Sequence, residues 1–213
     1  MTVIAIDGTF ASGKGTLGKR LAAHYNLSYL DTGKLYRAVG YTVMQAGDDP
    51  ENAAHAAKAA KAITGNELDD PILKSGVVAI NASKVAVHPK VREALFQFQR
   101  DFAAKGAVLD GRDIGTVICP DADVKFYVDA KAEVRAERRH TELTGYGEDI
   151  TFETVLAQLV ERDNRDKTRK EAPLKAADDA HLIETSAMGI DEVFETAVKI
   201  TDAVLALRNV PKG

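Results

Sequence analysis

The sequence predicts an α/β fold in which helices cover both faces of a doubly wound, five-stranded parallel sheet. Five short apolar runs alternate with longer segments of helical periodicity, and this alternation requires crossover connections between parallel strands. A length of 213 residues suits one domain with appended lobes. A hydrophobic share of 45% is enough for a sizeable core.

The predicted strands are short and apolar. Val3 to Asp7 is expected to be fully buried, because it is a continuous apolar run that ends at a glycine. The other four predicted strands cover residues 27–30, 107–109, 124–128 and 181–183.

Prolines and glycines mark the ends of two predicted helices. Pro50 and Pro89 are expected in first turns, and Gly65 and Gly106 are expected to end the helices that follow. Two further helices are predicted from apolar residues at helical spacing, in residues 15–25 and 190–205.

Secondary structure is hardest to predict in residues 66–88. Val77, Val78 and Ile80 fit either a short strand or a piece of helix.

Charge and cysteine content exclude several classes of protein. The formal net charge is -4, whereas nucleic-acid binding proteins carry a basic excess, so we expect no nucleic acid as a partner. Cys119 is the only cysteine, so we expect no internal disulfide and a small buried thiol in a reduced compartment. No secretion signal is recognisable, and no apolar run approaches the ~20 residues of a membrane span. We therefore expect a cytoplasmic protein that binds no membrane.

A glycine-rich loop follows the first strand directly. Its glycines let backbone N–H groups turn toward an anion, and the next helix adds its positive end. Lys14 can supply a positive charge to the β- and γ-phosphates of a nucleotide. Since Gly15 stands where Ser or Thr usually binds Mg²⁺, Thr16 is the candidate for the metal shell. We expect this loop to bind the phosphates of a nucleotide together with Mg²⁺, through Gly8, Thr9, Phe10, Ala11, Ser12, Gly13, Lys14, Gly15 and Thr16. GTPase switches, transport ATPases and kinases all contain such a loop, so the loop alone does not decide between them.

Polar residues follow the second and third predicted strands. Thr32 and Arg37 should lie near the glycine-rich loop, because ligands of a doubly wound sheet lie beyond the carboxyl ends of its strands. Asp110 closes the third strand, where acidic residues often hold the waters around Mg²⁺. Arg112 can donate two N–H bonds to a phosphate, and Asp113 can accept from an amino group or a hydroxyl.

Arginines in the last third of the chain predict a lid. Arg162, Arg165 and Arg169 recur at i, i+3 and i+7, so they share one face if the helix persists that far. Arg138 and Arg139 lie on an earlier predicted helix. Two basic helical arms could close over a triphosphate, exclude water and bring arginines to the transferred group.

These segments together resemble the bacterial cytidylate kinases, members of the nucleoside monophosphate kinase family. The likeness covers nearly the whole chain. It rests on IDGTFASGKGT (6–16), DTGKLYR (31–37), SKVAVHPKVREAL (83–95), DGRDIGTVICPDADVKFYVDA (110–130), ERDNRDKTR (161–169) and AP (172–173).

The resemblance implies a P-loop kinase fold with a helical lid and a small acceptor-binding lobe. It also implies transfer of the γ-phosphoryl group of ATP to CMP or dCMP, a place in pyrimidine metabolism, and small nucleotides as the only partners of a monomer. The implied core covers residues 1–33, 107–130 and 180–213, the acceptor lobe about 34–106, and the lid about 131–179.

The resemblance further implies a role for each matching side chain. The acceptor phosphate would be held by Arg37, Arg112 and Arg169, and cytosine would be read by Ser83, Arg92 and Asp113. The sugar hydroxyls would meet Arg162 and Asp166, with Thr32 and Asp110 completing the acceptor site. The catalytic residues would be Lys14, Arg112, Arg162 and Arg169.

Two departures and two alternatives accompany this interpretation. Thr32 stands where Ser is common, and residues 66–82 look too short for the small β-lobe of many bacterial members, which predicts a reduced acceptor lobe. One alternative is a kinase that acts on UMP or AMP, although the Gly-Phe-Pro-Arg run of adenylate kinases is absent. The other is a non-catalytic nucleotide switch, although the Asn-Lys-x-Asp guanine motif of GTPases is absent.

Overall fold

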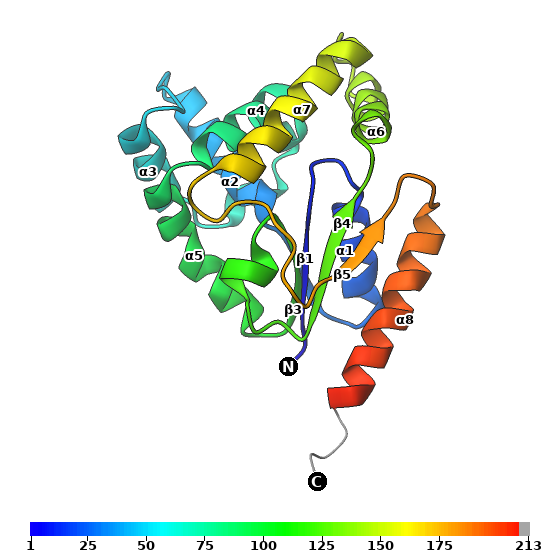
Figure 1. Ribbon diagram of the computed structural model, residues 1–213. Helices are drawn as coiled ribbons and strands as arrows, with labels where there is room; N and C mark the ends of the chain where they lie inside the picture. Colours follow the sequence, from blue (N-terminus) through cyan, green and yellow to red (C-terminus); the bar gives the residue numbers. More distant parts are fainter. Residues whose placement is uncertain (209–213) are drawn as a thin grey trace.

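The computed structural model describes residues 1–208, and within them lies one five-stranded parallel sheet (Figure 1). The strand order is β2-β3-β1-β4-β5. All four neighbouring pairs run parallel, and Ile6 of the central strand lies between Asp110 and Phe126. The predicted doubly wound sheet is confirmed. Its strands are β1 (Val3–Gly8), β2 (Ser28–Asp31), β3 (Ala107–Asp110), β4 (Val124–Asp129) and β5 (His181–Glu184).

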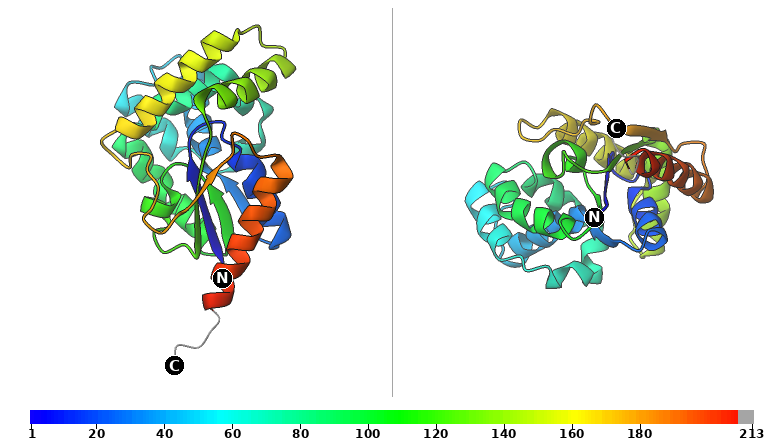
Figure 2. Two further views of the ribbon diagram at one scale, coloured as in Figure 1. Left: turned by 45° about the vertical axis from the view of Figure 1, so that its right-hand side comes forward. Right: turned by 90° about the horizontal axis from the view of Figure 1, so that it is seen from below.

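Helices cover both faces of the sheet, because the side chains of each strand alternate between two apolar clusters. Ile4 and Ile6 face α1 (Lys14–His24) and α8 (Ile190–Arg208), whereas Ala5 faces the opposite cluster. That opposite cluster is covered by α2 (Thr32–Gln45), α3 (Ala53–Lys61) and α5 (Pro89–Ala103). Figure 2 shows α1 and α8 on one side of the sheet and the cyan and green helices on the other.

The two helices predicted to form the lid share a small apolar core of their own. α6 (Ala132–Gly145) and α7 (Phe152–Thr168) lie beyond the carboxyl end of the sheet, at the top of Figure 1. The buried residues that join them are Ala136, Leu143, Val155 and Leu159. Because this cluster is separate from the two clusters of the sheet, the lid packs largely on itself.

The segment that the sequence left ambiguous is helical. Residues Gly76–Val85 form α4, which follows two 3₁₀ turns, Asn66–Asp69 and Pro71–Lys74. Ser75 caps α4 by accepting from the N–H of Val78 at 3.4 Å. Residues 66–85 contain no strand, so they do not form the small β-lobe of many bacterial members. That this segment belongs to a reduced acceptor-binding lobe stays a prediction.

One predicted helix start was wrong. Pro50 does not lie in the first turn of α3, because Asn52 caps that helix with bonds from the N–H groups of Ala54 (2.9 Å) and His55 (3.3 Å). Pro89, in contrast, is the first residue of α5, as predicted.

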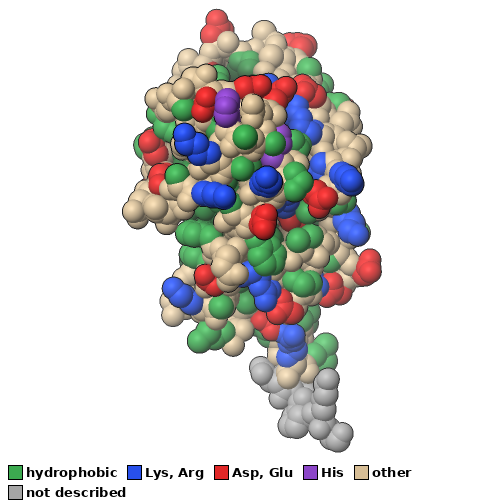
Figure 3. Space-filling model, turned by 90° about the vertical axis from the view of Figure 1, so that its left-hand side faces the viewer, with side chains coloured by type: hydrophobic (Ala, Val, Ile, Leu, Met, Phe, Trp, Pro, Cys, Tyr) green, Lys and Arg blue, Asp and Glu red, His purple; other side chains and the backbone are tan. Residues whose placement is uncertain are grey.

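Three further expectations concern Cys119, the surface charges and membrane-spanning helices. Cys119 is buried, at 2% exposure, as expected. Acidic and basic side chains are interspersed with hydrophobic ones on the face shown in Figure 3. Within residues 1–208, none of the helices combines the length and hydropathy that crossing a membrane requires. The last five residues of the predicted core range, 209–213, lie outside the described part.

Candidate active site

The glycine-rich loop joins β1 to α1 at the carboxyl end of the central strand. Gly8 has φ +145°, and a Cβ there would lie 1.9 Å from the carbonyl oxygen of Val128, so only glycine lets the loop leave the sheet at this point. Gly13 also has a positive φ and directly precedes α1. The loop borders a crevice of about 370 Å³, which the lid covers from the other side.

Lys14 is buried at the floor of this crevice. Its Nζ donates to the carbonyl oxygen of Thr9 at 2.6 Å and lies 3.5 Å from the hydroxyl of Ser12. Burial, and then the nearby Arg112 charge, lower the pKa of Lys14 from 10.5 to about 7. An anion in the crevice would supply the countercharge that the lysine lacks.

Asp110, which the sequence suggests as a residue near Mg²⁺, ends β3 and borders the same crevice as Lys14. Tyr29 donates a hydrogen bond to its carboxylate. Burial, and then the Asp31 charge, raise the pKa of Asp110 to about 7. A carboxylate with this environment fits a Mg²⁺ ion held through water, because the ion would supply the missing positive charge. Within residues 1–208, no group of three carboxylate, thiol or imidazole side chains could enclose a metal by itself.

Gly15 and Thr16 occupy different positions relative to Asp110. A Cβ at Gly15 would lie 3.8 Å from the Asp110 carboxylate and 3.5 Å from the Tyr29 hydroxyl. Thr16 lines the same crevice with an exposed side chain. The position that faces the carboxylate therefore has no side chain, and Tyr29 fills the space beside it.

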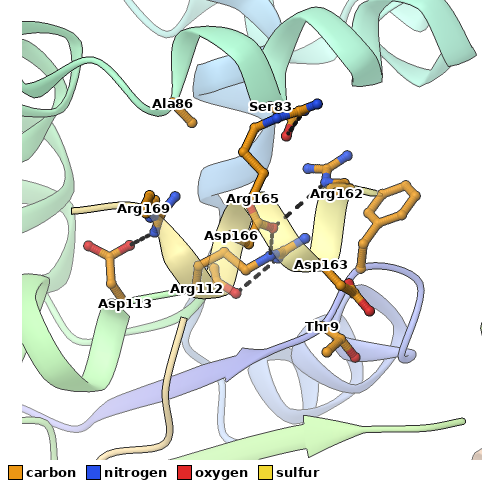
Figure 4. Close-up of polar contacts among 12 residues, drawn as sticks. Thr9, Ser83, Ala86, Arg112, Asp113, Arg162, Asp163, Arg165, Asp166 and Arg169 are labelled. Atoms are coloured by element: carbon orange, nitrogen blue, oxygen red, sulfur yellow. Dashed lines mark hydrogen bonds and ion pairs between the residues drawn. The ribbon is translucent and has the colours of Figure 1, made fainter. Parts of the chain in front are cut away.

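Two carboxylates organise the predicted acceptor residues (Figure 4). Asp166 accepts from Nε of Arg112 at 2.9 Å and lies 3.8 Å from Nε of Arg162. Asp113 pairs with Arg92 and lies 3.7 Å from Arg169. Burial opposes the ionisation of Asp166, but Arg112, Arg162 and Arg169 together lower its pKa. Both aspartates are therefore fixed by arginines from separate elements.

The remaining acceptor candidates lie at the rim of this network. Thr32 donates to the carbonyl oxygen of Asp110 at 2.7 Å, and Arg37 donates to the carbonyl oxygen of Leu73 at 2.6 Å. Ser83 of α4 accepts from Arg165 of α7 at 2.7 Å. Thr32 and Ser83 border one space between the sheet, α4 and α7, whereas Arg37 and Asp110 border the crevice at Lys14.

The cavity between the sheet, α4 and α7 measures about 40 Å³. A neighbouring cavity of about 340 Å³ between α4 and the predicted lid is bordered by Phe10, Ser83 and Arg162. A further cavity of about 210 Å³ borders the glycine-rich loop and is largely apolar, lined in part by Leu17, Met188 and Val193. The crevice at Lys14 thus connects a polar, arginine-rich side with an apolar side.

Several residues that shape the site were not assigned a role from the sequence. Asp7 accepts from the N–H groups of Ile114 (2.8 Å) and Gly115 (2.7 Å) and so holds the loop that carries Arg112. Arg135 donates to Asp163 of α7 at 2.6 Å. For Asp7, its place in an apolar strand was the one signal in the sequence. The pair of Arg135 with Asp163 joins residues 28 positions apart, and no local sequence pattern indicates such a pair.

The comparison with known families agrees with this arrangement. The sequence model of the cytidylate kinase family matches residues 4–203. The chain belongs to the cytidylate kinase family. This confirms the resemblance found in the sequence.

Curated cytidylate kinases of two bacteria illustrate how closely the family matches. The cytidylate kinase of Rhodopseudomonas palustris (strain ATCC BAA-98 / CGA009) is 53% identical over 208 residues, covering 97% of this chain and 98% of that protein. That of Nitrobacter winogradskyi is 52% identical over 204 residues, covering 95% and 96%.

Solved structures with lower identity share the fold. A gluconokinase from Sinorhizobium meliloti 1021 has a TM-score of 0.51 at 14% identity, over 98% of this chain and 97% of that one. An uncharacterized protein from Eubacterium ventriosum ATCC 27560 has a TM-score of 0.57 at 17% identity, over 95% and 99%. The cytidylate kinase family member described here therefore has the P-loop kinase fold that its sequence predicted.

Proposed function

We propose that this member of the cytidylate kinase family transfers the γ-phosphoryl group of ATP to CMP or dCMP, giving ADP and CDP or dCDP. The observation that carries the proposal is the arginine–aspartate network, which faces Lys14 across one crevice. A nucleotide switch needs a phosphate loop but no second, arginine-rich ligand site. A phosphotransferase needs both sites, in line with each other.

The residue roles proposed here are those that the family resemblance implies, and the chemistry of the side chains supports them. Arg37, Arg112 and Arg169 would hold the acceptor phosphate, because guanidinium groups donate paired bonds to its oxygens. Ser83, Arg92 and Asp113 would read cytosine, since together they offer donors and acceptors for its polar edge. Arg162 and Asp166 would meet the sugar, with Thr32 and Asp110 at the edge of the same site.

The donor would lie along the glycine-rich loop. Its phosphates would accept from the N–H groups of residues 8–16 and from Lys14, and its base would enter the apolar cavity beside Leu17 and Met188. Mg²⁺ bound with ATP would neutralise charge on the β- and γ-phosphates. Asp110 would hold that ion through water. The hydroxyl of Thr16, at the wall of the crevice, is the second proposed ligand of the ion.

The reaction would need no covalent enzyme intermediate. An oxygen of the acceptor phosphate attacks the γ-phosphorus, and the bond from that phosphorus to the bridging oxygen of ADP breaks. Lys14, Arg112, Arg162 and Arg169 would stabilise the negative charge on the transferred group. No base is required, because the attacking phosphate oxygen is already ionised at neutral pH.

One chain contains all the residues assigned above, so we propose that a monomer holds a complete site. We also propose that the acceptor lobe (about 34–106) and the lid (about 131–179) move relative to the core (1–33, 107–130 and 180–208) when nucleotides enter.

A coupled assay of ADP release tests the proposal. The protein is incubated with ATP and Mg²⁺ against CMP, dCMP, UMP, AMP, GMP and dTMP. We expect fast turnover with CMP and dCMP and at least tenfold lower kcat/KM with the others, because their bases offer the wrong donors and acceptors. Turnover of another monophosphate would overturn the cytosine assignment, and no turnover with any would overturn the kinase.

A further inference from the structure

Phe10 is the aromatic residue of the glycine-rich loop, and its ring faces two arginines of the lid. The guanidinium carbon of Arg162 lies 4.1 Å from the ring centroid, and that of Arg139 lies 5.6 Å away. Both distances are within the range of a cation–π interaction. The ring therefore connects the loop expected to bind ATP with the arginines expected to act on the transferred group.

Arg162 has few other groups that fix its position. Its Nε atom is buried and has no hydrogen-bond partner, and the carboxylate of Asp166 is 3.8 Å away. Its Nη1 donates only a long bond of 3.3 Å, to the carbonyl oxygen of Ala79. Burial is the main cause that lowers the pKa of Arg162 to about 9. A ring face beneath the guanidinium offsets part of this cost of burial.

Phe10 and Arg162 border the same crevice as Lys14. The ring and the guanidinium therefore both lie at the wall of the crevice where the phosphates are expected. The carbonyl oxygen of Phe10 also accepts from Arg135 at 3.1 Å, which fixes the backbone of Phe10 to the base of the lid.

Apolar packing is the competing explanation for this aromatic residue. The ring also packs against the lid core formed by Leu143, Val155 and Leu159. A leucine would keep most of that apolar contact but would remove the ring face, whereas a tyrosine would keep the ring. The two roles can therefore be separated by substitution.

We propose that Phe10 is a positioning residue, whose ring holds the Arg162 guanidinium over the phosphate crevice through a cation–π contact. The proposal rests on the proposed kinase function, because its kinetic consequence is measured in phosphoryl transfer.

The kinetic test compares Phe10→Leu with Phe10→Tyr. For Phe10→Leu we expect kcat to fall about tenfold while KM for ATP changes less than about threefold, since about tenfold is the scale of a desolvated cation–π contact. Phe10→Tyr should recover most of that loss. Phe152→Leu is the matched control, because Phe152 packs in the same lid cluster and its ring pairs with His140. If Phe10→Tyr is as slow as Phe10→Leu, or if Phe152→Leu is equally slow, packing explains Phe10 and the proposal fails.

A double-mutant cycle tests whether the ring acts through Arg162. Replacing Phe10 with Leu in an Arg162→Ala background should change kcat less than about twofold, because the partner of the ring is already gone. Additive losses would overturn the proposal.

A spectroscopic readout separates failure of this proposal from failure of the kinase assignment. In the NMR spectrum of the ligand-free protein, the ring should shift the Arg162 Nε–H resonance upfield, and Phe10→Leu should abolish the shift. The resonance is assigned by its loss in Arg162→Lys. If the shift is absent from the unmodified protein, the ring does not hold the guanidinium, whatever the enzyme phosphorylates.

Discussion

Lys14 forms no ion pair within residues 1–208, and its burial has a measurable consequence for nucleotide binding. Burial lowers the pKa of Lys14 in the free protein, so the neutral lysine is favoured more at pH 8 than it is in water. Bound phosphates would favour the charged form and raise this pKa, so binding should take up protons. Affinity for ADP should therefore decline as the pH rises from 7 to 9.

Calorimetry in buffers of different ionisation enthalpy measures this uptake. At pH 8 we expect up to one proton to be taken up on binding of ADP without Mg²⁺. Lys14→Arg is the matched control, because arginine stays charged throughout this range and any remaining uptake belongs to other groups such as Asp110. Equal uptake by both proteins would show that Lys14 is already charged in the free enzyme.

The sequence suggested single residues of the candidate site but not the pairs that they form. Lys14 and Arg112 were predicted because each follows a short apolar strand, which fixes where the chain leaves the sheet. The pair between Arg112 and Asp166 joins residues 54 positions apart, and no local pattern reports such a contact. The bond from Arg165 to Ser83 was missed for the same reason.

At the scale of elements, the sequence predicted strands well and the acceptor lobe poorly. The three inner strands β3, β1 and β4 are largely buried on both faces, so their apolar runs are continuous and indicate a strand clearly. The edge strands β2 and β5 are partly exposed and were predicted from their short apolar runs. Residues 76–85 were ambiguous, because Val77, Val78 and Ile80 favour a strand by composition. The helix forms there because Ser75 caps it and because Val78 is buried in an apolar cluster with Ala38 of α2.

Asp7 links two elements, and its substitution tests how that link supports the site. Its carboxylate accepts two backbone N–H bonds from the π-helical turn Ile114–Ile118, directly after Arg112 and Asp113. In Asp7→Asn the amide can accept only one of them. We expect the free energy of unfolding to fall by about 1–3 kcal/mol, the cost of one unsatisfied buried donor. KM for the acceptor should rise more than KM for ATP.

The pH dependence of this effect has a defined sign. Burial raises the pKa of Asp7 from 3.8 to about 6, so the folded state favours the protonated carboxyl. The corresponding stability is present below pH 4 and is lost as the pH rises to 6. Chemical denaturation should therefore show the advantage over Asp7→Asn shrinking between pH 4 and 6. Asp121→Asn, at an exposed surface pair, is the control and should show no such change. A constant difference across this range would show that Asp7 is ionised throughout.

At the scale of the whole molecule, two contacts join the predicted lid to the predicted acceptor lobe. Glu148, between α6 and α7, accepts from the N–H of Gly76 at 2.9 Å, in the first turn of α4. Arg139 donates to the carbonyl oxygen of Lys74 at 3.2 Å. A movement of α6 and α7 away from α4 would break both hydrogen bonds.

Glu148→Ala should therefore favour the open arrangement in the ligand-free protein. We expect amide hydrogen exchange in residues 74–80 and 146–150 to speed up about tenfold, the scale of one lost hydrogen bond to a charged group. Glu153→Ala is the matched control, because Glu153 is an exposed carboxylate on the same lid. Adding CMP with ADP should restore protection in Glu148→Ala, since bound nucleotides would join the lid to the core through the arginines instead. If exchange in both segments matches that of the control, the Glu148 bond does not hold the lid closed, and other contacts of α7 with α4, such as that of Arg165 with Ser83, must do so.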